Sequence, residues 1–418
     1  MEFALPLMII AVLAGLYMAW AIGANDVANA MGTSVGSGAL TLKQAIVVAA
    51  VFEFGGAMIA GASVSKTIRK GIVDPAGFES APELLVFGMI GSLLAAAIWL
   101  NIASRLGWPV STTHSIVGAI VGFACVALGV DAVNWAKVGT IVASWVTSPL
   151  LSGTTAFVLF WGLQRSIFRS EDPLAATRKW APLMVFGTTF VLALVTLFKG
   201  LKHLKLDFGL GTSMAIAAAV GVVGAVVGQV LLKRLRTDPV DPEKGFAHTP
   251  VEKIFAILQI YTACAVAFAH GSNDVANAIG PLAAVVATIQ TGAVAAKSTV
   301  PLWMLFIGGV GIVIGLATYG YKVMATIGEK ITELKPSRGY AAEFAAAVTI
   351  VLASQLGLPI STTHTLIGAV LGVSLARGIA ATNFAMVGQI VLSWIITIPA
   401  GAGLSVLFYF ILKAIFGS

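Results

Sequence analysis

The chain has 418 residues, of which 58% are hydrophobic and 10% are charged, and its mean hydropathy is +0.96. This composition excludes a water-soluble globular protein and indicates an all-α integral membrane protein. The net charge of +7 does not indicate a nucleic-acid-binding protein, because the basic residues lie in short loops between apolar runs, where they act as topology signals.

Apolar runs along the chain predict twelve membrane-spanning helices. The first run follows Glu2 instead of a basic segment and leads directly into a polar motif, so we expect a retained helix and not a cleaved signal peptide. Residues 31–40 and 279–292 are too polar or too broken for simple crossings and predict interrupted or re-entrant backbone. The expected spans cover residues 4–22, 43–61, 84–104, 110–129, 137–161, 181–198, 210–232, 252–270, 301–320, 341–357, 360–376 and 383–412.

The expected spans form two repeats joined by a linker. Residues 1–232 hold seven spans, residues 251–418 hold five, and the Pro- and charge-rich residues 233–250 form a cytoplasmic linker. Because seven crossings separate the two starts, the second repeat enters from the opposite face, as in the inverted repeats of secondary transporters. If residues 110–129 were re-entrant, the repeats would be parallel. With the linker inside, most Lys and Arg lie on the inner side and both termini lie outside.

Two polar motifs occur twice in this apolar chain. GANDVANA at residues 23–30 returns as GSNDVANA at residues 271–278, and PVSTTH at residues 109–114 returns as PISTTH at residues 359–364. Polar side chains are unfavourable inside a bilayer, so a sequence that carries the same set twice is expected to use both copies at one site.

The STTH strings predict two helix starts that bind an anion. Each string follows a proline and precedes an apolar helical run, and a helix start offers unpaired N–H groups and a positive dipole end. Capping alone would explain one copy, whereas duplication favours an anion site. Asp26 and Asp274 can accept the proton of hydrogen phosphate. The expected anion ligands are Ser111, Thr112, Thr113, Ser361, Thr362, Thr363, Asp26 and Asp274.

The NDVAN strings predict cation sites. An Asp and the Asn three residues later lie on one face of a helix, so their oxygens can converge. Such oxygens suit hard cations, and no His or Cys cluster suggests a transition metal. The alternative is that these side chains only cap or link helices. The expected sodium ligands are Asn25, Asp26, Asn29, Asn273, Asp274 and Asn277.

Charge balance connects the two kinds of site. An anion beside Asp26 and Asp274 adds negative charge in a medium where isolated charge is strongly disfavoured. Mobile cations must then supply the compensation, so anion and cation binding depend on each other, which is the basis of symport. Lys and Arg are absent from the stretches that carry the motifs, residues 23–42, 109–131, 271–296 and 358–376.

Further ionisable residues are candidates for the transport pathway. Glu53 and Glu343 lie in apolar runs and neither has an acidic counterpart in the other repeat. His270 adjoins the second NDVANA and has no histidine counterpart in the first, although a His near an Asp can relay protons. His114 and His364 are expected to bond a neighbouring carbonyl group and to fix the helix start.

The paired NDVANA and STTH strings resemble those of the inorganic phosphate transporter (PiT) family of sodium- or proton-coupled phosphate permeases, over nearly the whole chain. The resemblance implies twelve helices in inverted repeats, termini outside, and phosphate at the repeat interface with cations beside it. It also implies functional acids at Asp26, Glu53, Asp274 and Glu343, and a homodimer. The short linker is similar to that of compact prokaryotic members.

We therefore expect a sodium-coupled importer of inorganic phosphate in the cell membrane that works by alternating access. It is not an enzyme, needs no cofactor and binds no nucleic acid. Sodium is preferred over protons because the expected site is rich in oxygen and lacks a paired His. A sulfate permease and a proton-coupled phosphate symporter are alternatives with the same fold. A hydrolase using Ser111 with His114, or Ser361 with His364, lacks a GxSxG elbow, and a passive channel would not drive uphill uptake.

Overall fold

The structure, a computed structural model, describes residues 3–70, 72–73, 75–197, 209–234, 249–294, 300–355 and 360–417. Within these ranges the chain is built from helices and connecting turns, and the one isolated β-bridge joins Val73 and Val133. Eight of the described helices are long and apolar enough to cross a membrane. The prediction of an all-α membrane protein is therefore confirmed, while most of the predicted linker, residues 235–248, lies outside the described residues.

Each of the twelve predicted spans overlaps a described helix, although the number that crosses the membrane stays a prediction. The first part of the chain contains α1 (Ala4–Gly36), α2 (Leu42–Lys70), α3 (Pro82–Leu106), α4 (Thr112–Leu128), α5 (Trp135–Leu163), α6 (Pro173–Val195) and α8 (Leu210–Arg234). The second contains α9 (Pro250–Thr291), α10 (Leu302–Tyr319), α11 (Tyr321–Ala325), α12 (Pro336–Gln355), α13 (Thr362–Arg377) and α14 (Phe384–Phe416). Short 3₁₀ or π segments are η1 (Pro75–Phe78), η2 (Val130–Ala132), η3 (Gln164–Phe168), η5 (Thr326–Lys330) and η6 (Ile379–Ala381).

The prediction of interrupted backbone is wrong for residues 31–36 and 279–291, which are helical, and the chain leaves α1 only at residues 37–41. Helix α1 continues to Gly36, and α9 continues to Thr291 with Pro281 inside it. The polar side chains in α1 do not break the helix because Thr33 and Ser34 donate hydrogen bonds to a buried carboxylate of α12. The two motif-bearing helices are therefore longer than the predicted spans 4–22 and 252–270.

The helical structure is interrupted instead immediately before the STTH helices. Helix α3 ends at Leu106 and is capped by Gly107, whose φ of +68° is in the left-handed region that favours glycine. Helix α4 begins at Thr112. Helix α4 has 17 residues, so its length of roughly 25 Å falls short of a hydrocarbon core of about 30 Å.

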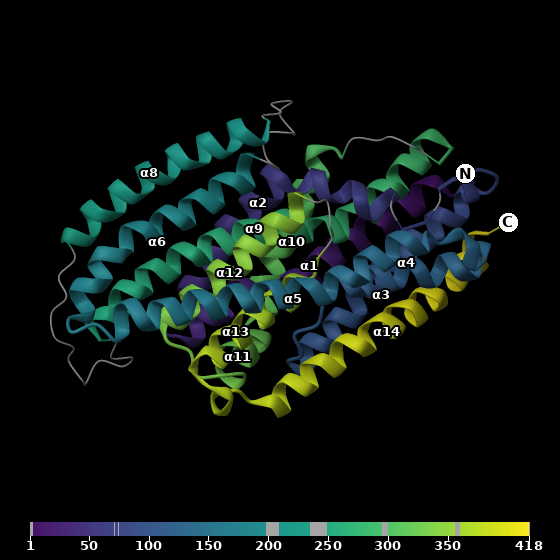
Figure 1. Ribbon diagram of the computed structural model, residues 1–418. Helices are drawn as coiled ribbons and strands as arrows, with labels where there is room; N and C mark the ends of the chain where they lie inside the picture. Colours follow the sequence, from purple (N-terminus) through teal and green to yellow (C-terminus); the bar gives the residue numbers. More distant parts are fainter. Residues whose placement is uncertain are drawn as a thin grey trace.

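The two parts of the chain exchange helices in a reciprocal way (Figure 1). Helix α5 packs against α12 and α13, while α14 packs against α3 and α4. Likewise, α1 packs against α10 and α2 packs against α9. The rings of Phe3 and Phe416 lie 5.5 Å apart, so both ends of the chain lie at the same end of the bundle.

Glycines allow the helices of these exchanged pairs to approach closely. A Cβ atom at Gly315 of α10 would lie 1.9 Å from the carbonyl oxygen of Trp20 in α1. A Cβ atom at Gly271 of α9 would lie 2.1 Å from the carbonyl oxygen of Glu53 in α2. Such backbone contact is possible only without a side chain, and it holds the NDVANA helices against their partners.

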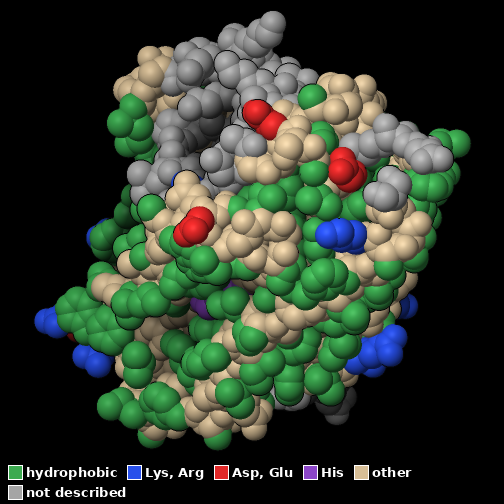
Figure 2. All heavy atoms as spheres, turned by 90° about the vertical axis from the view of Figure 1, so that its right-hand side faces the viewer, with side chains coloured by type: hydrophobic (Ala, Val, Ile, Leu, Met, Phe, Trp, Pro, Cys, Tyr) green, Lys and Arg blue, Asp and Glu red, His purple; other side chains and the backbone are tan. Residues whose placement is uncertain are grey.

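Figure 2 shows the end of the bundle that carries the termini. Hydrophobic side chains cover most of the described surface in this view, with a few separate charged side chains, and a histidine is visible in a recess between them. The two motif carboxylates are buried beneath this surface, since Asp26 and Asp274 are each 1% exposed.

Candidate functional site

Each NDVAN string forms a small polar cluster on one helical face. Asn29 Nδ2 donates to Asp26 Oδ1 at 3.0 Å in α1, and Asn277 Nδ2 donates to Asp274 Oδ1 at 3.3 Å in α9. The spacing of three residues produces this contact within an unbroken helix. The predicted convergence of the Asp and Asn side chains is therefore present in both copies.

Each STTH string begins a helix, as its sequence predicts. Ser111 and Ser361 have extended backbone angles and precede the first helical residue. Their hydroxyl oxygens accept hydrogen bonds from the backbone amides of His114 and His364, at 3.2 and 3.1 Å. This is the geometry of an N-cap, so the serines stabilise the two helix starts.

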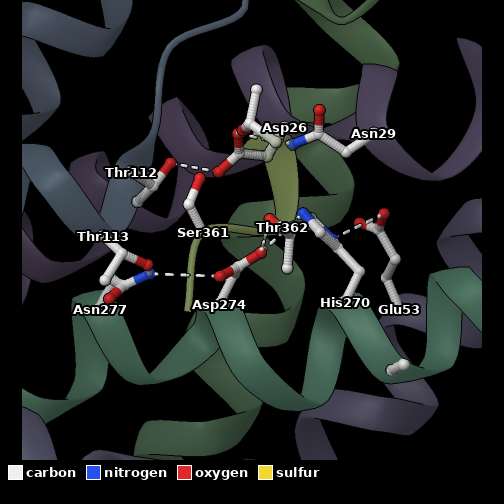
Figure 3. Close-up of polar contacts among 12 residues, drawn as sticks. Asp26, Asn29, Glu53, Thr112, Thr113, His270, Asp274, Asn277, Ser361 and Thr362 are labelled. Atoms are coloured by element: carbon white, nitrogen blue, oxygen red, sulfur yellow. Dashed lines mark hydrogen bonds and ion pairs between the residues drawn. The ribbon is translucent and has the colours of Figure 1, made fainter. Parts of the chain in front are cut away.

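Within each repeat, the helix start meets the aspartate. Thr112 Oγ1 donates to Asp26 Oδ2, and Thr362 Oγ1 donates to Asp274 Oδ2 at 2.9 Å. Both carboxylates thus lie beside the N-terminus of a helix, α4 or α13, where the helix dipole favours negative charge. Figure 3 shows these side chains turned toward one another from four separate segments.

Hydrogen bonds also cross from one repeat to the other. Asn29 Nδ2 donates to Thr363 Oγ1 at 2.8 Å, and the equivalent Asn277 Nδ2 lies 3.5 Å from Thr113 Oγ1. The last hydroxyl of each string, moreover, donates to a backbone oxygen at the other helix start: Thr363 to Val110 and Thr113 to Ile360, both at 3.2 Å. The two motif pairs therefore form one site with matching contacts on its two sides.

The first asparagine of each NDVAN string has a different environment. Asn25 Nδ2 donates to Ser104 Oγ and to the Trp108 carbonyl oxygen, while Asn25 Oδ1 accepts from the Val110 amide. These bonds join α1 to the end of α3 and to the turn that precedes α4. Asn273 is 4% exposed and lies at the matching position of α9.

His270 lies on the Asp274 side of the site, between Asp274 and Glu53 (Figure 3). Its Nε2 atom lies 2.8 Å from Asp274 Oδ2, and its Nδ1 atom lies 3.1 Å from Glu53 Oε1. Both side chains of the Glu53–His270 pair are fully buried. The expectation that the site lacks a paired His is therefore wrong. Helix α2 packs against α9 and brings Glu53 next to His270, although the two residues are far apart in the sequence.

The Glu53–His270 pair breaks the symmetry of the site. Gly271 and Gly23 occupy equivalent positions in the two motifs, and each approaches the backbone of a neighbouring helix. Gly271 lies against the carbonyl group of Glu53, and Gly23 lies against the carbonyl group of Ile312. Ile312 and Ile22 therefore stand on the Asp26 side, where Glu53 and His270 stand on the Asp274 side. The two carboxylates have the same threonine and asparagine partners but different neighbours beyond them.

The centre of the site has the donor atoms of a cation site. One oxygen of Asp26, one oxygen of Asp274 and one ring nitrogen of His270 all lie within 4.8 Å of one another. Carboxylate, amide and hydroxyl oxygens dominate the surroundings, which suits a hard cation better than a transition metal. The predicted residues Asp26, Asn29, Asp274 and Asn277 are therefore brought together with the helix starts.

Glu343 belongs to a separate polar cluster. Its carboxylate accepts hydrogen bonds from Thr33 and Ser34 at 2.6 Å, from Thr262 at 2.6 Å and from Gln259 at 3.0 Å. Helices α1, α9 and α12 all contribute to this cluster, and Glu343 is fully buried. The carboxylate thus links the two motif-bearing helices to α12.

Substitution Glu343→Gln is expected to destabilise the protein and reduce transport. The glutamine amide would place an NH₂ group where a carboxylate oxygen now accepts hydrogen bonds, so at least one donor would lose its acceptor. Each buried polar group left unsatisfied costs about 1–3 kcal/mol of folding free energy. Thermal unfolding in detergent measures the first effect and uptake by proteoliposomes the second. Glu343→Asp keeps the charge and is the matched control. An unchanged melting temperature in Glu343→Gln would contradict the role of the carboxylate as a link.

A row of four aromatic rings, in which the two central histidines meet edge to face, was not expected from the sequence. The rings of His114 and Trp145 have centroids 3.6 Å apart, those of His364 and Trp394 lie 3.5 Å apart, and the two histidines lie 4.3 Å apart. The predicted carbonyl contact is present at His364, whose Nδ1 lies 3.2 Å from the Trp145 oxygen. The signal available was a Ser-Trp pair repeated at Trp145 and Trp394.

Comparisons with known proteins agree with this arrangement. Residues 22–405 match the model of the "Phosphate transporter family". A "Putative phosphate permease" of Haemophilus influenzae is 48% identical over 96% of this chain and 96% of its own length. A similarly named protein of Pyrococcus abyssi is 46% identical over 97% of this chain and 98% of its own.

A solved structure is similar over the same extent. "The sodium-dependent phosphate transporter" has a TM-score of 0.89 and 42% sequence identity, and the match covers 99% of this chain and 100% of that one. Family and fold point to a permease and not to an enzyme, so the hydrolase reading of the Ser and His residues is set aside. The chain belongs to the phosphate transporter family.

Proposed function

We propose that this protein is a secondary active symporter that imports inorganic phosphate together with sodium. The observation that carries the proposal is the pairing of two buried carboxylates with two helix starts: Asp26 with Thr112, and Asp274 with Thr362. The named function of the similar solved structure, a sodium-dependent phosphate transporter, supports the same ions. No Lys or Arg in the motif stretches competes with mobile cations for the role of counter-charge.

Phosphate would bind between the two helix starts. The hydroxyls of Thr113 and Thr363 lie within hydrogen-bonding distance of a backbone oxygen at the opposite helix start, so the two starts lie close together. A helix N-terminus favours an anion. We propose the ligand set Ser111, Thr112, Thr113, Ser361, Thr362 and Thr363, with Asp26 and Asp274 available to accept the proton of hydrogen phosphate.

Sodium would bind at the carboxylates and release donors for phosphate. Each threonine hydroxyl has one hydrogen, and Thr112 and Thr362 give theirs to Asp26 and Asp274. A cation that takes over these carboxylate oxygens frees the hydroxyl hydrogens for phosphate oxygens. Each ligand then favours the other. The proposed sodium ligands are Asp26, Asn29, Asp274 and Asn277, with the oxygens of Asn25 and Asn273 beside them.

A proton is the second candidate for the coupling ion. The continuous contacts from Glu53 to His270 and from His270 to Asp274, at 3.1 and 2.8 Å, would suit proton movement between a buried acid and the site. Glu53, His270 and Glu343 are the proposed pathway residues. On the Asp26 side of the site, Ile22 occupies the position that His270 has on the Asp274 side. The surroundings of Asp26 are therefore rich in oxygen without a histidine, which favours sodium there.

Alternating access would move one set of helices around the fixed site. The reciprocal packing of α5 and α14 supports two repeats of inverted topology, residues 1–232 and 251–418, around a cytoplasmic linker. Phe3 and Phe416, near the two ends of the chain, lie in contact. An even number of membrane crossings, such as the proposed twelve, places both ends on the same side of the membrane and agrees with this contact. We further propose a homodimer in the plasma or inner membrane with both termini outside.

Uptake by proteoliposomes tests the coupling ion. With a sodium gradient alone, radiolabelled phosphate should accumulate above its external concentration, whereas a pH gradient alone should leave it at equilibrium. Accumulation driven by the pH gradient in sodium-free buffer would replace sodium by protons in the proposal. Excess sulfate in the same assay should leave phosphate uptake unchanged, and full competition would favour the sulfate permease.

Thermal unfolding tests the mutual dependence of the two ligands without any gradient. Phosphate should raise the melting temperature in sodium buffer and have little effect in choline buffer of equal ionic strength. A ligand at about 100 times its Kd stabilises the folded state by about 2.7 kcal/mol, which such measurements detect. Equal stabilisation by phosphate with and without sodium, at several pH values, would show that the anion binds without a compensating cation.

A further inference from the structure

Helix α8 stands apart from the bundle that holds the site (Figure 1). It packs against α6, where Gly224 approaches Thr189 and Gly228 approaches Val185 so closely that a Cβ atom would lie within 3.0 Å of the neighbour. The rest of α8 is apolar and exposed. Only 17% of its apolar segment is buried inside the structure.

A groove runs between α8 and α9, with α6 at its floor. Its volume is about 860 Å³. From α6 and α8 it is lined by Val185, Thr189, Val220, Val227, Leu231 and Arg234, and from α9 by Ile257, Tyr261 and Cys264.

The groove offers almost no unsatisfied polar atoms except at one end. The hydroxyl of Thr189 lies 2.7 Å from the Tyr261 hydroxyl and 2.7 Å from the Val185 carbonyl oxygen, so these polar atoms are already paired. The apolar lining of the groove is therefore suited to a hydrocarbon chain. The end of α8 differs, because Arg234 lines the groove there and Lys233 precedes it in the last turn.

The length of the groove fits one lipid leaflet. From Val220 to Arg234 the helix rises by roughly 21 Å, and half of the hydrocarbon core is about 15 Å. An acyl chain that lies along α8 would thus bring its headgroup to the basic end of the helix. Basic residues at a membrane surface attract anionic lipid headgroups, and each contributes modestly to that attraction.

We propose that this groove binds an anionic phospholipid, with its acyl chain between α8 and α9 and its phosphate at Arg234. The lipid would join α8 and α6 to the first half of α9. Cys264 in the groove precedes Asp274 of the site by ten residues on the same helix. A bound lipid would therefore contact the helix that carries one half of the transport site.

Protection of Cys264 from a thiol reagent tests this proposal. In full-length protein carrying Cys125→Ser, Cys264 is the sole cysteine. Phosphatidylglycerol added to the detergent solution should slow its reaction with a fluorescent maleimide at a concentration about fivefold lower than phosphatidylcholine, the ratio expected for one basic contact. Arg234→Gln should remove this difference, and Arg105→Gln, which changes an exposed arginine of α3 outside the groove, should keep it.

Phospholipid retained through purification provides a second readout if Cys264 reacts too slowly to compare. Wild-type protein should retain more phosphatidylglycerol per chain than Arg234→Gln. Equal protection by both lipids, or equal retention by wild type and Arg234→Gln, would overturn the proposal. Protection by inorganic phosphate alone would also overturn it and assign the basic end to free anions. Protection that grows with protein concentration in the absence of lipid would assign the groove to a second copy of the chain.

Discussion

Asp26→Asn and Asp274→Asn are each expected to abolish sodium-driven phosphate uptake. Asn has nearly the same shape and keeps one oxygen for Thr112 or Thr362, so the fold should survive. The charge that compensates the cation is lost. Removing one partner of a buried charge pair costs about 3–5 kcal/mol, so cation affinity should fall by roughly 100-fold or more.

The two substitutions should differ in their effect on stability. Asp274→Asn leaves His270 and Glu53 facing an amide, whereas Asp26→Asn leaves that pair untouched. We therefore expect a larger fall in melting temperature for Asp274→Asn. Uptake by proteoliposomes and sodium-dependent thermal stabilisation are the measurements, and Asp131→Asn, an exposed aspartate in η2, is the control. Wild-type uptake in either variant would contradict a cation site formed by both carboxylates.

Gly56→Ala is expected to destabilise the protein severely, while Gly55→Ala should have little effect. A Cβ atom at Gly56 would lie 2.1 Å from the carbonyl oxygen of Phe268, and a Cβ atom at Gly55 would have no neighbour within 4 Å. Overpacking costs about 1–3 kcal/mol even where side chains can adjust, and here the neighbour is backbone. Helices α2 and α9 would have to separate, which would also move Glu53 away from His270.

Adjacent glycines make this comparison unusually well matched. Both lie in the middle of α2, so the gain in helix propensity from alanine, at most about 1 kcal/mol, is common to both variants. Melting temperature and elution as a single species in gel filtration measure the outcome. Equal stability of the two variants would show that α2 and α9 do not approach as closely as the structure indicates.

Several features of the fold and site followed from the amino-acid pattern alone. Composition predicted membrane helices, and each expected span overlaps a helix. The i, i+3 spacing predicted the contact between Asp26 and Asn29, and the proline and serine before each STTH string predicted the helix starts. These features depend on neighbours in the sequence, so local periodicity and capping rules are sufficient to find them.

Helix continuity was harder to predict. Residues 31–36 looked too polar for a helix. The acceptor that satisfies the hydroxyls of Thr33 and Ser34 is the Glu343 carboxylate, which lies more than 300 residues later in the sequence. The actual break, at residues 107–111, is marked by Gly107 and by the serine cap that follows.

The contacts that unite the site required the packed helices. Asn29 meets Thr363, Asn277 meets Thr113, and Glu53 meets His270, each across more than 150 residues of sequence. In a membrane protein nearly every helix face is apolar, so hydropathy does not say which helices become neighbours. Close backbone approach at glycines such as Gly56 and Gly271 decides those neighbours, and with them the difference between the two halves of the site.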